Sequence, residues 1–271
     1  MAGQEERYDR IADGYATWWS PVHRGATLRL LDEVEPVVRA GATRLLDIGS
    51  GTGAMGAAAV ARWPGIEVDG VDISTGMIAI AEREQASLDV AARTRLRFHH
   101  APADRLPFAD GSLDLVLSAF VLQLVPSRYR ALREARRVLA PGGRIGYVTW
   151  LTGGTPFAGD AAYDAALEAV GLEPREYGGG HDLDSLESAA AGLRRAGFTD
   201  VRASPDRLDH QFTPEGYLGF LAQFDDEDEF ASLDADVRAR LERELLARLR
   251  DLPPDGLRLA YPIVYVTGRR T

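Results

Sequence analysis

The segment that most constrains the fold covers residues 45–53, where an apolar strand reaches an acidic residue and runs into a glycine-rich turn, Leu-Leu-Asp-Ile-Gly-Ser-Gly-Thr-Gly. Because glycine has no Cβ, the backbone of such a turn adopts positive φ angles and approaches a small molecule closely. The helix expected at 53–62 directs unpaired N–H groups toward the same place. We therefore expect a nucleotide-like cofactor to bind at the turn, against Gly49, Ser50, Gly51, Thr52 and Gly53.

The identity of that cofactor depends on the residues that precede the turn. From Gly51 onward the sequence also fits the Gly-x-Gly-x-x-Gly pattern, whose first glycine ends a strand and contacts the pyrophosphate of a dinucleotide. Here Asp47 and Gly49 come earlier, and a carboxylate beside the loop would repel phosphate but suit an ammonium group. The next expected strand ends in Asp72. This residue is placed to accept hydrogen bonds from both ribose hydroxyls, whichever of the two kinds of cofactor binds. Asp47 thus favours a cofactor with an ammonium group, and an NAD(P)-dependent oxidoreductase is the alternative.

Further motifs follow in order along the chain. They are Tyr8-Asp9-x-x-Ala12-x-x-Tyr15, Gly70-Val71-Asp72-Ile73-Ser74-x-Gly76-Met77, Ala103-Asp104-x-Leu106-Pro107-Phe108, Phe-Ala-Asp-Gly-Ser-Leu-Asp-Leu-Val at 108–116, and Arg-Val-Leu-Ala-Pro-Gly-Gly at 137–143. With the glycine turn, this ordered set resembles the seven-stranded S-adenosylmethionine-dependent methyltransferases. Within them it is similar to the small-molecule branch that includes ubiquinone and menaquinone biosynthesis enzymes and many natural-product methyltransferases.

The resemblance implies S-adenosylmethionine as cofactor and roles for the matching residues. Asp47 and Thr52 would contact its amino-acid end, and Asp72 its ribose, although a helix cap is the alternative role for Asp72. Met77 would pack on the adenine, and Asp104 would accept from the adenine amino group. The expected cofactor-binding residues are Tyr8, Tyr15, Asp47, Gly49, Ser50, Gly51, Thr52, Gly53, Asp72, Ile73, Met77, Ala103, Asp104, Ser118, Ala119 and Phe120.

Apolar, β-branched runs alternate with helical patterns, which favours a Rossmann-like, doubly wound α/β fold with helices on both faces of the sheet. Strands are expected at 44–48, 66–72, 96–99, 113–118, 143–150, 199–204 and 259–267. In the resembled family the last strand inserts antiparallel and the order is 3-2-1-4-5-7-6. We expect a single domain with a helical lid at 1–40, a cofactor-binding core at 41–150, and cap insertions at 151–185 and 210–256.

Composition excludes several function classes. The chain contains no cysteine, lysine or asparagine, so thiolate metal sites, Schiff-base catalysis and the Asn-Pro-Pro-aromatic motif of amino-directed DNA methyltransferases are impossible. With a net charge of -10 and no basic stripe interleaved with aromatics, we expect no nucleic-acid partner. We interpret the acidic cluster at 225–229 as a solvated loop or helix start, not a metal site. No apolar run reaches membrane-spanning length and no secretion signal begins the chain, so we expect no membrane insertion and a cytoplasmic protein.

Methyl transfer depends mainly on holding the acceptor in line with the methyl group. Aromatic residues near the expected opening indicate a small aromatic or polyketide-like acceptor, bound by Trp18, Trp19, His23, Gln123, Trp150, Phe157 and His210. An oxygen acceptor also needs its proton removed, and His181 is the first candidate for that base, with His23 and His210 behind it. A structural role for His181 is the alternative, as is a protein that binds the cofactor without transferring its methyl group. The apolar stripe at 237–249 is core or a dimer seam, so we expect a monomer or homodimer.

The N-terminal segment places Tyr8, Ile11, Tyr15, Trp18 and Trp19 at helical spacing. Because a helix used only for core packing would carry more aliphatic residues, we expect a mobile lid over the cofactor and the acceptor. A helix docked permanently on the core is the alternative.

Overall fold

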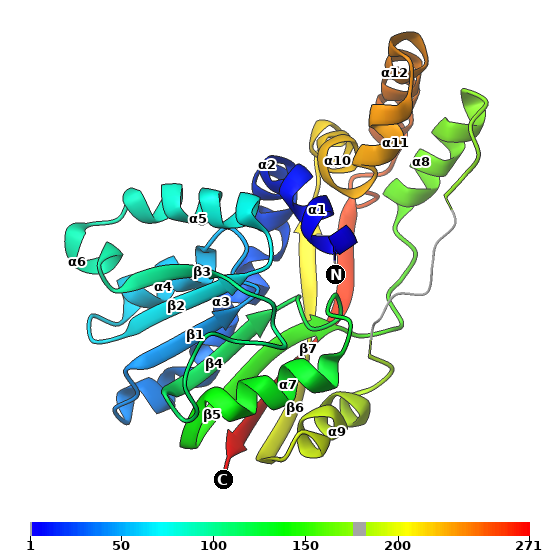
Figure 1. Ribbon diagram of the computed structural model, residues 1–271. Helices are drawn as coiled ribbons and strands as arrows, with labels where there is room; N and C mark the ends of the chain where they lie inside the picture. Colours follow the sequence, from blue (N-terminus) through cyan, green and yellow to red (C-terminus); the bar gives the residue numbers. More distant parts are fainter. Residues whose placement is uncertain (1, 176–182) are drawn as a thin grey trace.

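The computed structural model describes residues 2–175 and 183–271, and its centre is one seven-stranded sheet (Figure 1). The strand order is β3-β2-β1-β4-β5-β7-β6, as predicted, and β7 runs antiparallel to both of its neighbours. The other neighbouring strands are parallel to each other. The strands are β1 (Arg44–Ile48), β2 (Glu67–Asp72), β3 (Leu96–His100), β4 (Leu113–Ala119), β5 (Leu139–Trp150), β6 (Phe198–Gln211) and β7 (Arg258–Arg270).

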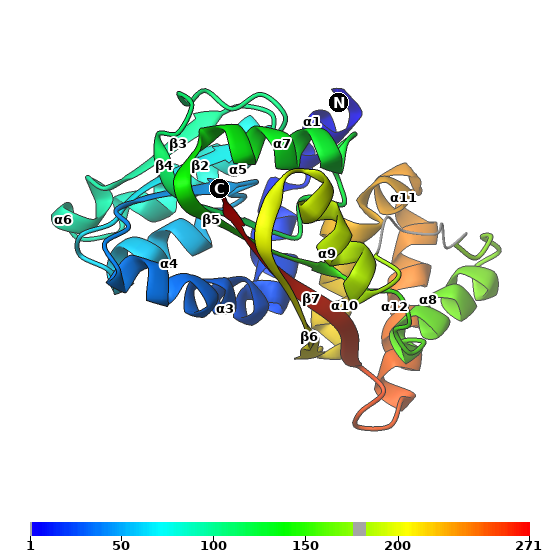
Figure 2. The same cartoon turned by 90° about the horizontal axis from the view of Figure 1, so that it is seen from below.

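Helices cover both faces of the sheet, which explains why its central strands are apolar almost throughout. α3 (Ser20–Arg39) and α4 (Ala54–Arg62) lie on one face, and α7 (Arg128–Val138) and α9 (Leu186–Arg195) lie on the other (Figure 2). α5 (Thr75–Ala86) and the short α6 (Val90–Arg93) complete the connection from β2 to β3. None of the described helices combines the length and apolar character needed to cross a membrane.

A helical cap stands beyond the carboxyl end of β5 (Figure 1). It consists of α8 (Ala158–Ala169), α10 (Pro214–Phe220), the π-helical turn η2 (Leu221–Asp225), α11 (Glu227–Ser232) and α12 (Ala235–Asp251). The predicted apolar stripe of α12 is core, because Leu241, Leu245 and Leu249 are buried and α12 packs against α8.

The last two strands are longer than the sequence predicted. β6 stays paired with β7 as far as Gln211 opposite Arg258, so His210 lies in a strand and not in a cap insertion. Two features of the sequence hide this extension. β6 is an edge strand with a largely polar exposed side, and it contains Pro205 just beyond the predicted end, where a proline normally argues against a strand.

The N-terminal segment bridges the core and the cap. It comprises α1 (Ala2–Arg10), α2 (Ala12–Gly14) and the π-helical turn η1 (Tyr15–Trp19), which continues into α3. The Asp9 carboxylate accepts hydrogen bonds from Ser74 Oγ at 2.7 Å and from the Gly76 N–H at 2.9 Å, at the start of α5. On the other side, Arg10 forms ion pairs with Glu227 and Asp228 in α11. The segment therefore closes over the carboxyl edge of the sheet, and its mobility stays a prediction.

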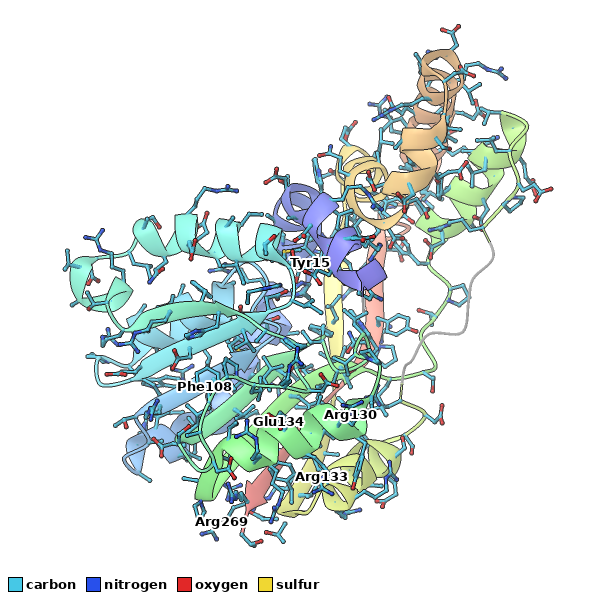
Figure 3. The ribbon with its side chains drawn as sticks, viewed as in Figure 1. Tyr15, Phe108, Arg130, Arg133, Glu134 and Arg269 are labelled. Carbon is cyan, nitrogen blue, oxygen red and sulfur yellow. The ribbon has the colours of Figure 1, made fainter. Side chains whose placement is uncertain are left out.

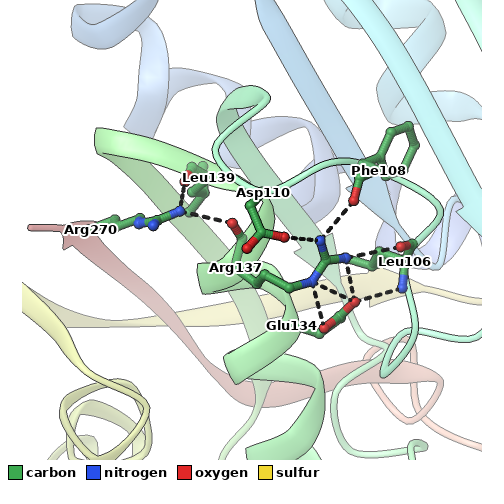
Figure 4. Close-up of polar contacts among 7 residues, drawn as sticks. All are labelled: Leu106, Phe108, Asp110, Glu134, Arg137, Leu139 and Arg270. Carbon is green, nitrogen blue, oxygen red and sulfur yellow. Dashed lines mark hydrogen bonds and ion pairs between the residues drawn. The ribbon is translucent and has the colours of Figure 1, made fainter.

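Arg137 of α7 holds the loop between β3 and β4 in place (Figure 4). Its guanidinium donates to the carbonyl oxygens of Leu106 at 3.0 Å and Phe108 at 2.8 Å, and it pairs with Asp110 and Glu134. Glu134 in turn accepts from the Leu106 N–H at 3.0 Å. These bonds fix the loop that carries Ala103 and Asp104. They also link two of the sequence motifs in space, because Arg137 of the second motif binds the backbone of Leu106 and Phe108 in the first.

We expect Arg137→Leu to lower the free energy of unfolding by about 2 kcal/mol, because the carbonyls of Leu106 and Phe108 lose a charged donor. Arg194→Leu is the matched control, since Arg194 forms one exposed ion pair with Glu187 and its loss should cost about 0.5 kcal/mol or less. Urea denaturation of the three proteins measures both effects. Equal midpoints for the two variants would contradict a structural role of Arg137.

Candidate active site

A cavity of about 320 Å³ lies at the carboxyl edge of the sheet, beneath the N-terminal segment and the cap. A smaller space of about 30 Å³ shares Tyr15, His23, Gly49 and Ala119 with it as lining residues. Most of the predicted cofactor-binding residues line one or the other. The larger cavity contacts Tyr8, Tyr15, Gly49, Gly51, Asp72, Ile73, Met77, Ala103, Asp104, Ala119 and Phe120, and the smaller contacts Asp47, Ser50 and Thr52.

The glycine turn has the backbone geometry that its sequence requires. Gly49, Gly51 and Gly53 have φ angles of 70°, 51° and 80°. A Cβ built on Gly51 would meet nothing closer than the Tyr15 ring at 3.7 Å, so the space in front of this residue is open. The turn thus exposes its backbone to the cavity at Gly51, whereas Gly53 packs against Phe98.

Asp72 joins the turn to the second strand. One carboxylate oxygen accepts from the Gly51 N–H at 2.8 Å and the other from the Ser74 N–H at 2.9 Å. The side-chain cap of α5 is Ser74, which accepts from the Met77 N–H, so Asp72 does not have the capping role that we weighed as an alternative. Burial raises the pKa of Asp72, while the N–H groups of Ser74 and Gly51 lower it. The carboxylate is therefore held in a fixed orientation beside the cavity.

Asp47 is the most buried carboxylate of the site, with 2% of its surface exposed. Burial, and then the charge of Asp72, raise the pKa of Asp47 to about 8. In the smaller space beside it, Ser50 Oγ is buried and has no hydrogen-bond partner among the described residues. A buried carboxylate and an unpartnered hydroxyl need a ligand that brings positive charge and N–H donors. An ammonium group meets both requirements.

The opposite part of the cavity is aromatic. The rings of Phe120 and Trp150 lie 4.4 Å apart, and Trp19 stacks on Phe224 with 5.7 Å between ring centroids. Phe120 has a φ angle of 57°, which is unfavourable for a residue with a large side chain. We call the space bounded by Trp19, Phe120, Trp150 and Phe224 the aromatic chamber.

A chain of three polar side chains borders this chamber. Tyr15 Oη lies 2.9 Å from His23 Nε2, and His23 Nδ1 lies 3.0 Å from Thr27 Oγ1. Burial lowers the pKa of His23 to about 4 and raises that of Tyr15, so both side chains are neutral at neutral pH. In the tautomer that satisfies all three groups, Tyr15 donates to His23 and His23 donates to Thr27.

Four of the predicted acceptor-binding residues line the cavity, namely Trp19, His23, Gln123 and Trp150. The other three do not line it. Trp18 lies against Gly219, Phe157 packs on Tyr217, and the His210 ring lies against Phe212. Ser118 donates to the Ile48 carbonyl and lies behind the cavity wall. His181 lies outside the described residues, and its catalytic role stays a prediction.

Arg7, Phe224 and Asp225 are among the cavity residues that sequence reasoning missed. Asp225 belongs to the acidic cluster that we interpreted as a solvated loop or helix start, and its side chain is 40% exposed although it also lines the cavity. Asp225 and Asp226 form ion pairs with Arg175, and burial raises the pKa of Asp225 to about 6. The remainder of the cluster begins α11, as expected. No local pattern in the sequence places Asp225 at the cavity, because only the packing of the cap brings it there.

Comparisons with known proteins agree with this geometry. A family described as methyltransferase domain matches residues 46–146. Malonyl-[acyl-carrier protein] O-methyltransferase of Geobacter sulfurreducens is 30% identical, over 95% of this chain and 93% of that protein. Nocamycin O-methyltransferase of Saccharothrix syringae is 32% identical, over 97% and 96%.

Solved structures share the fold. The [4+2]-cyclase SpnF is 25% identical with a TM-score of 0.53, over 89% of this chain and 80% of that chain. Phosphoethanolamine N-methyltransferase 2 of Haemonchus contortus, solved with S-adenosylhomocysteine, is 22% identical with a TM-score of 0.51, over 88% and 52%. From the matched motifs, the strand order and relatives aligned over nearly their whole length, we conclude that this chain belongs to the seven-stranded S-adenosylmethionine-dependent methyltransferases and that S-adenosylmethionine is its cofactor.

Proposed function

We propose that this enzyme methylates an oxygen atom of a small, largely apolar acceptor, aromatic or polyketide-like, by in-line displacement. One observation carries the proposal: a charged cofactor compartment and the aromatic chamber share a single cavity, so donor and acceptor can meet without an intervening protein wall. Relatives support this acceptor class. Two that match are named 27-O-demethylrifamycin SV methyltransferase and nocamycin O-methyltransferase.

In this proposal the cofactor lies along the glycine turn. Asp47 receives its ammonium group, with Ser50 and Thr52 beside it, and Asp72 accepts hydrogen bonds from the ribose hydroxyls. Met77, Ile73, Ala103 and Asp104 surround the adenine, and Tyr8 and Tyr15 close the site from above. Met77 also packs with Ala12 and Ile80, so a core role and a cofactor role coexist in one side chain.

The aromatic chamber receives the acceptor. Its flat side chains bury apolar surface without offering strong hydrogen bonds, which suits a ring system or a polyketide chain. Trp150 and Phe120 form one wall, and Trp19 and Phe224 form the other. Gln123 supplies an amide at the floor, and the Thr149 hydroxyl fixes it by donating a hydrogen bond of 3.0 Å to its oxygen. Enclosure of the chamber also excludes water from the reacting groups.

S-adenosylmethionine supplies a methyl group that is already activated by the sulfonium charge, so the residues must mainly orient the acceptor and take its proton. Tyr15 Oη accepts the proton of the acceptor hydroxyl and passes its own proton to His23 Nε2. His23 keeps its Nδ1–H bond to Thr27, which holds the imidazole in the tautomer that can accept. His181, which we predicted as the base, is the competing candidate.

The direct test incubates the purified protein with S-adenosylmethionine and a panel of phenols and hydroxylated polyketides. We expect S-adenosylhomocysteine and an acceptor heavier by one methylene group, located on oxygen by fragmentation. Cofactor binding with a rearranged acceptor of unchanged mass would instead indicate a protein that uses the pocket without methyl transfer. Binding of NAD and none of S-adenosylhomocysteine would contradict the cofactor assignment.

Asp72→Ala should weaken S-adenosylhomocysteine binding by roughly 10- to 150-fold, because charge-assisted hydrogen bonds to the ribose contribute about 1.5 to 3 kcal/mol. Asp114→Ala is the matched control. Asp114 also accepts two backbone N–H bonds, from Thr43 and Arg44, but at the opposite edge of the sheet. Calorimetric titration should give wild-type affinity for the control. Wild-type affinity in a folded Asp72 variant would contradict ribose binding.

Gly51→Ala places a methyl group in the open space where we expect the cofactor to approach the backbone of Gly51. Binding of S-adenosylhomocysteine should therefore fall by at least about tenfold. Gly41→Ala has the same unfavourable feature, since Gly41 has a φ angle of 109° and no atom within 4 Å of a built Cβ, but it lies far from the cavity. Both variants should lose about 1 kcal/mol of stability from the positive φ angle. If both bind S-adenosylhomocysteine equally well, the turn is structural only.

The pH dependence of kcat/KM distinguishes His23 from an ordinary histidine base. Because burial lowers the pKa of His23 to about 4, His23 stays neutral and able to accept a proton down to about pH 5. We expect no acid limb near pH 6.5, where a histidine of ordinary pKa would be protonated. His23→Gln should reduce kcat by about 10²-fold, whereas His210→Gln should not. An acid limb near pH 6.5 that disappears in His181→Gln would assign the base to His181 instead.

A further inference from the structure

A second concave region, on the other side of Asp104 from the active-site cavity, is lined by arginines. It has a volume of about 660 Å³ and lies on the outer side of α7, where the ends of α9 and β7 meet that helix. We call it the arginine groove, and its cationic residues are Arg130, Arg133, Arg136, Arg137, Arg195 and Arg270. Asp104, Asp110 and Glu134 also line the groove, so six arginines stand against three carboxylates in a chain whose net charge is -10.

Some of these arginines serve the fold, and others have no anionic partner. Arg137 pairs with Asp110 and Glu134, and Arg270 donates to backbone carbonyls. By contrast, within residues 2–175 and 183–271 no carboxylate lies at ion-pair distance from Arg133 or Arg195, which are both exposed. Exposed guanidinium groups that the fold does not use are available to an anionic partner.

The groove reaches the rim of the active-site cavity. Asp104 lines both spaces, and Arg130 Nε lies 3.5 Å from its carboxylate. Ser127, the side-chain cap of α7, also lines the cavity. In Figure 3 the labelled Arg130 and Arg133 lie on α7, below the helices of the cap. A molecule bound along α7 would therefore lie beside Asp104 and Ser127, which line the active-site cavity.

The chemistry of the groove favours a protein partner. Tyr129, with 47% of its surface exposed, lies beside Arg133 and presents an aromatic surface to solvent. Tyrosine and arginine together are the residues most enriched in protein interfaces. α7 has eleven residues and is about 16 Å long, which matches one acidic helix of a small protein. A long polyanion would extend past the groove onto a surface that repels it.

We propose that the arginine groove docks a small acidic helical protein that carries the methyl acceptor on a flexible arm and presents it to the cavity. This rests on the proposed function, because it states how the acceptor of the same site is delivered. Arg133 and Arg195 act in docking and not in chemistry, since neither lines the cavity. A free acceptor, as used to test the proposed function, then lacks the carrier protein and the contacts that this protein makes with the groove.

The test measures binding of purified holo-acyl carrier protein, a small acidic helical probe, to the full-length enzyme by fluorescence anisotropy at low and at physiological salt. The groove variant is Arg133→Glu/Arg195→Glu. The matched control is Arg240→Glu/Arg243→Glu, which makes the same change in net charge on two exposed arginines of α12. We expect the groove variant to bind at least about tenfold more weakly, the control to bind like the wild type, and wild-type affinity to fall steeply with salt.

The affinity of both variants for S-adenosylhomocysteine is the control, and we expect it to be unchanged because the fold and the cofactor site should stay intact. Equal binding of the probe by all three proteins, or no binding at low salt, overturns the proposal. Binding of duplex DNA or of phosphatidylserine vesicles that the groove variant loses, without binding of the probe, also overturns it. Methyl transfer to free acceptors with no probe binding leaves the proposed function standing and removes only this inference. Probe binding that the groove variant loses, without methyl transfer to any free or probe-bound acceptor, overturns the proposed function and with it the delivery role of the groove.

Discussion

The site depends on two carboxylates that the fold buries beneath one glycine turn. Asp72 is stabilised by the N–H groups of Gly51 and Ser74, whereas no hydrogen bond to the Asp47 side chain exists within the described residues. Burial of an uncompensated carboxylate is costly, and its raised pKa expresses that cost. We infer that cofactor binding relieves it, since an ammonium group restores the charged form of Asp47. The turn is thus a receptor for a cation.

The aromatic chamber is assembled from segments that lie about as far apart as the chain allows. Trp19 comes from η1 near the start, Phe120 and Trp150 end central strands, and Phe224 comes from η2 near the other end. Both helical turns are π-helical, and they pack on each other above the cavity. Such turns are frequent at functional sites, because the extra residue re-aims the side chains that follow. The roof of the chamber is therefore one unit made of the lid and the cap.

Local patterns explain why the cofactor compartment was predictable and why the part of the site that the cap contributes was not. The strands β1 to β4, the glycine turn and Asp72 follow from apolar runs and glycines that are contiguous in sequence. Phe224 and Asp225 enter the cavity only because the cap folds back over the sheet. The arginine groove escaped prediction for the same reason, since α7, α9 and β7 contribute its residues from three separate stretches.

The strain at Phe120 connects the two compartments. A positive φ angle at a residue with a large side chain costs about 1 to 2 kcal/mol and persists only where the surroundings enforce it. Here the Phe120 N–H donates to the Val148 carbonyl at 2.9 Å, and its ring is held by Trp150. The sharp bend carries Val121 over Gly49, where a built Cβ would lie 2.2 Å from the valine. Because the bend and the turn fit only together, any shift of the cofactor loop at Gly49 must also move the wall of the aromatic chamber. In the proposed function, this one rigid contact would therefore position both cofactor and acceptor.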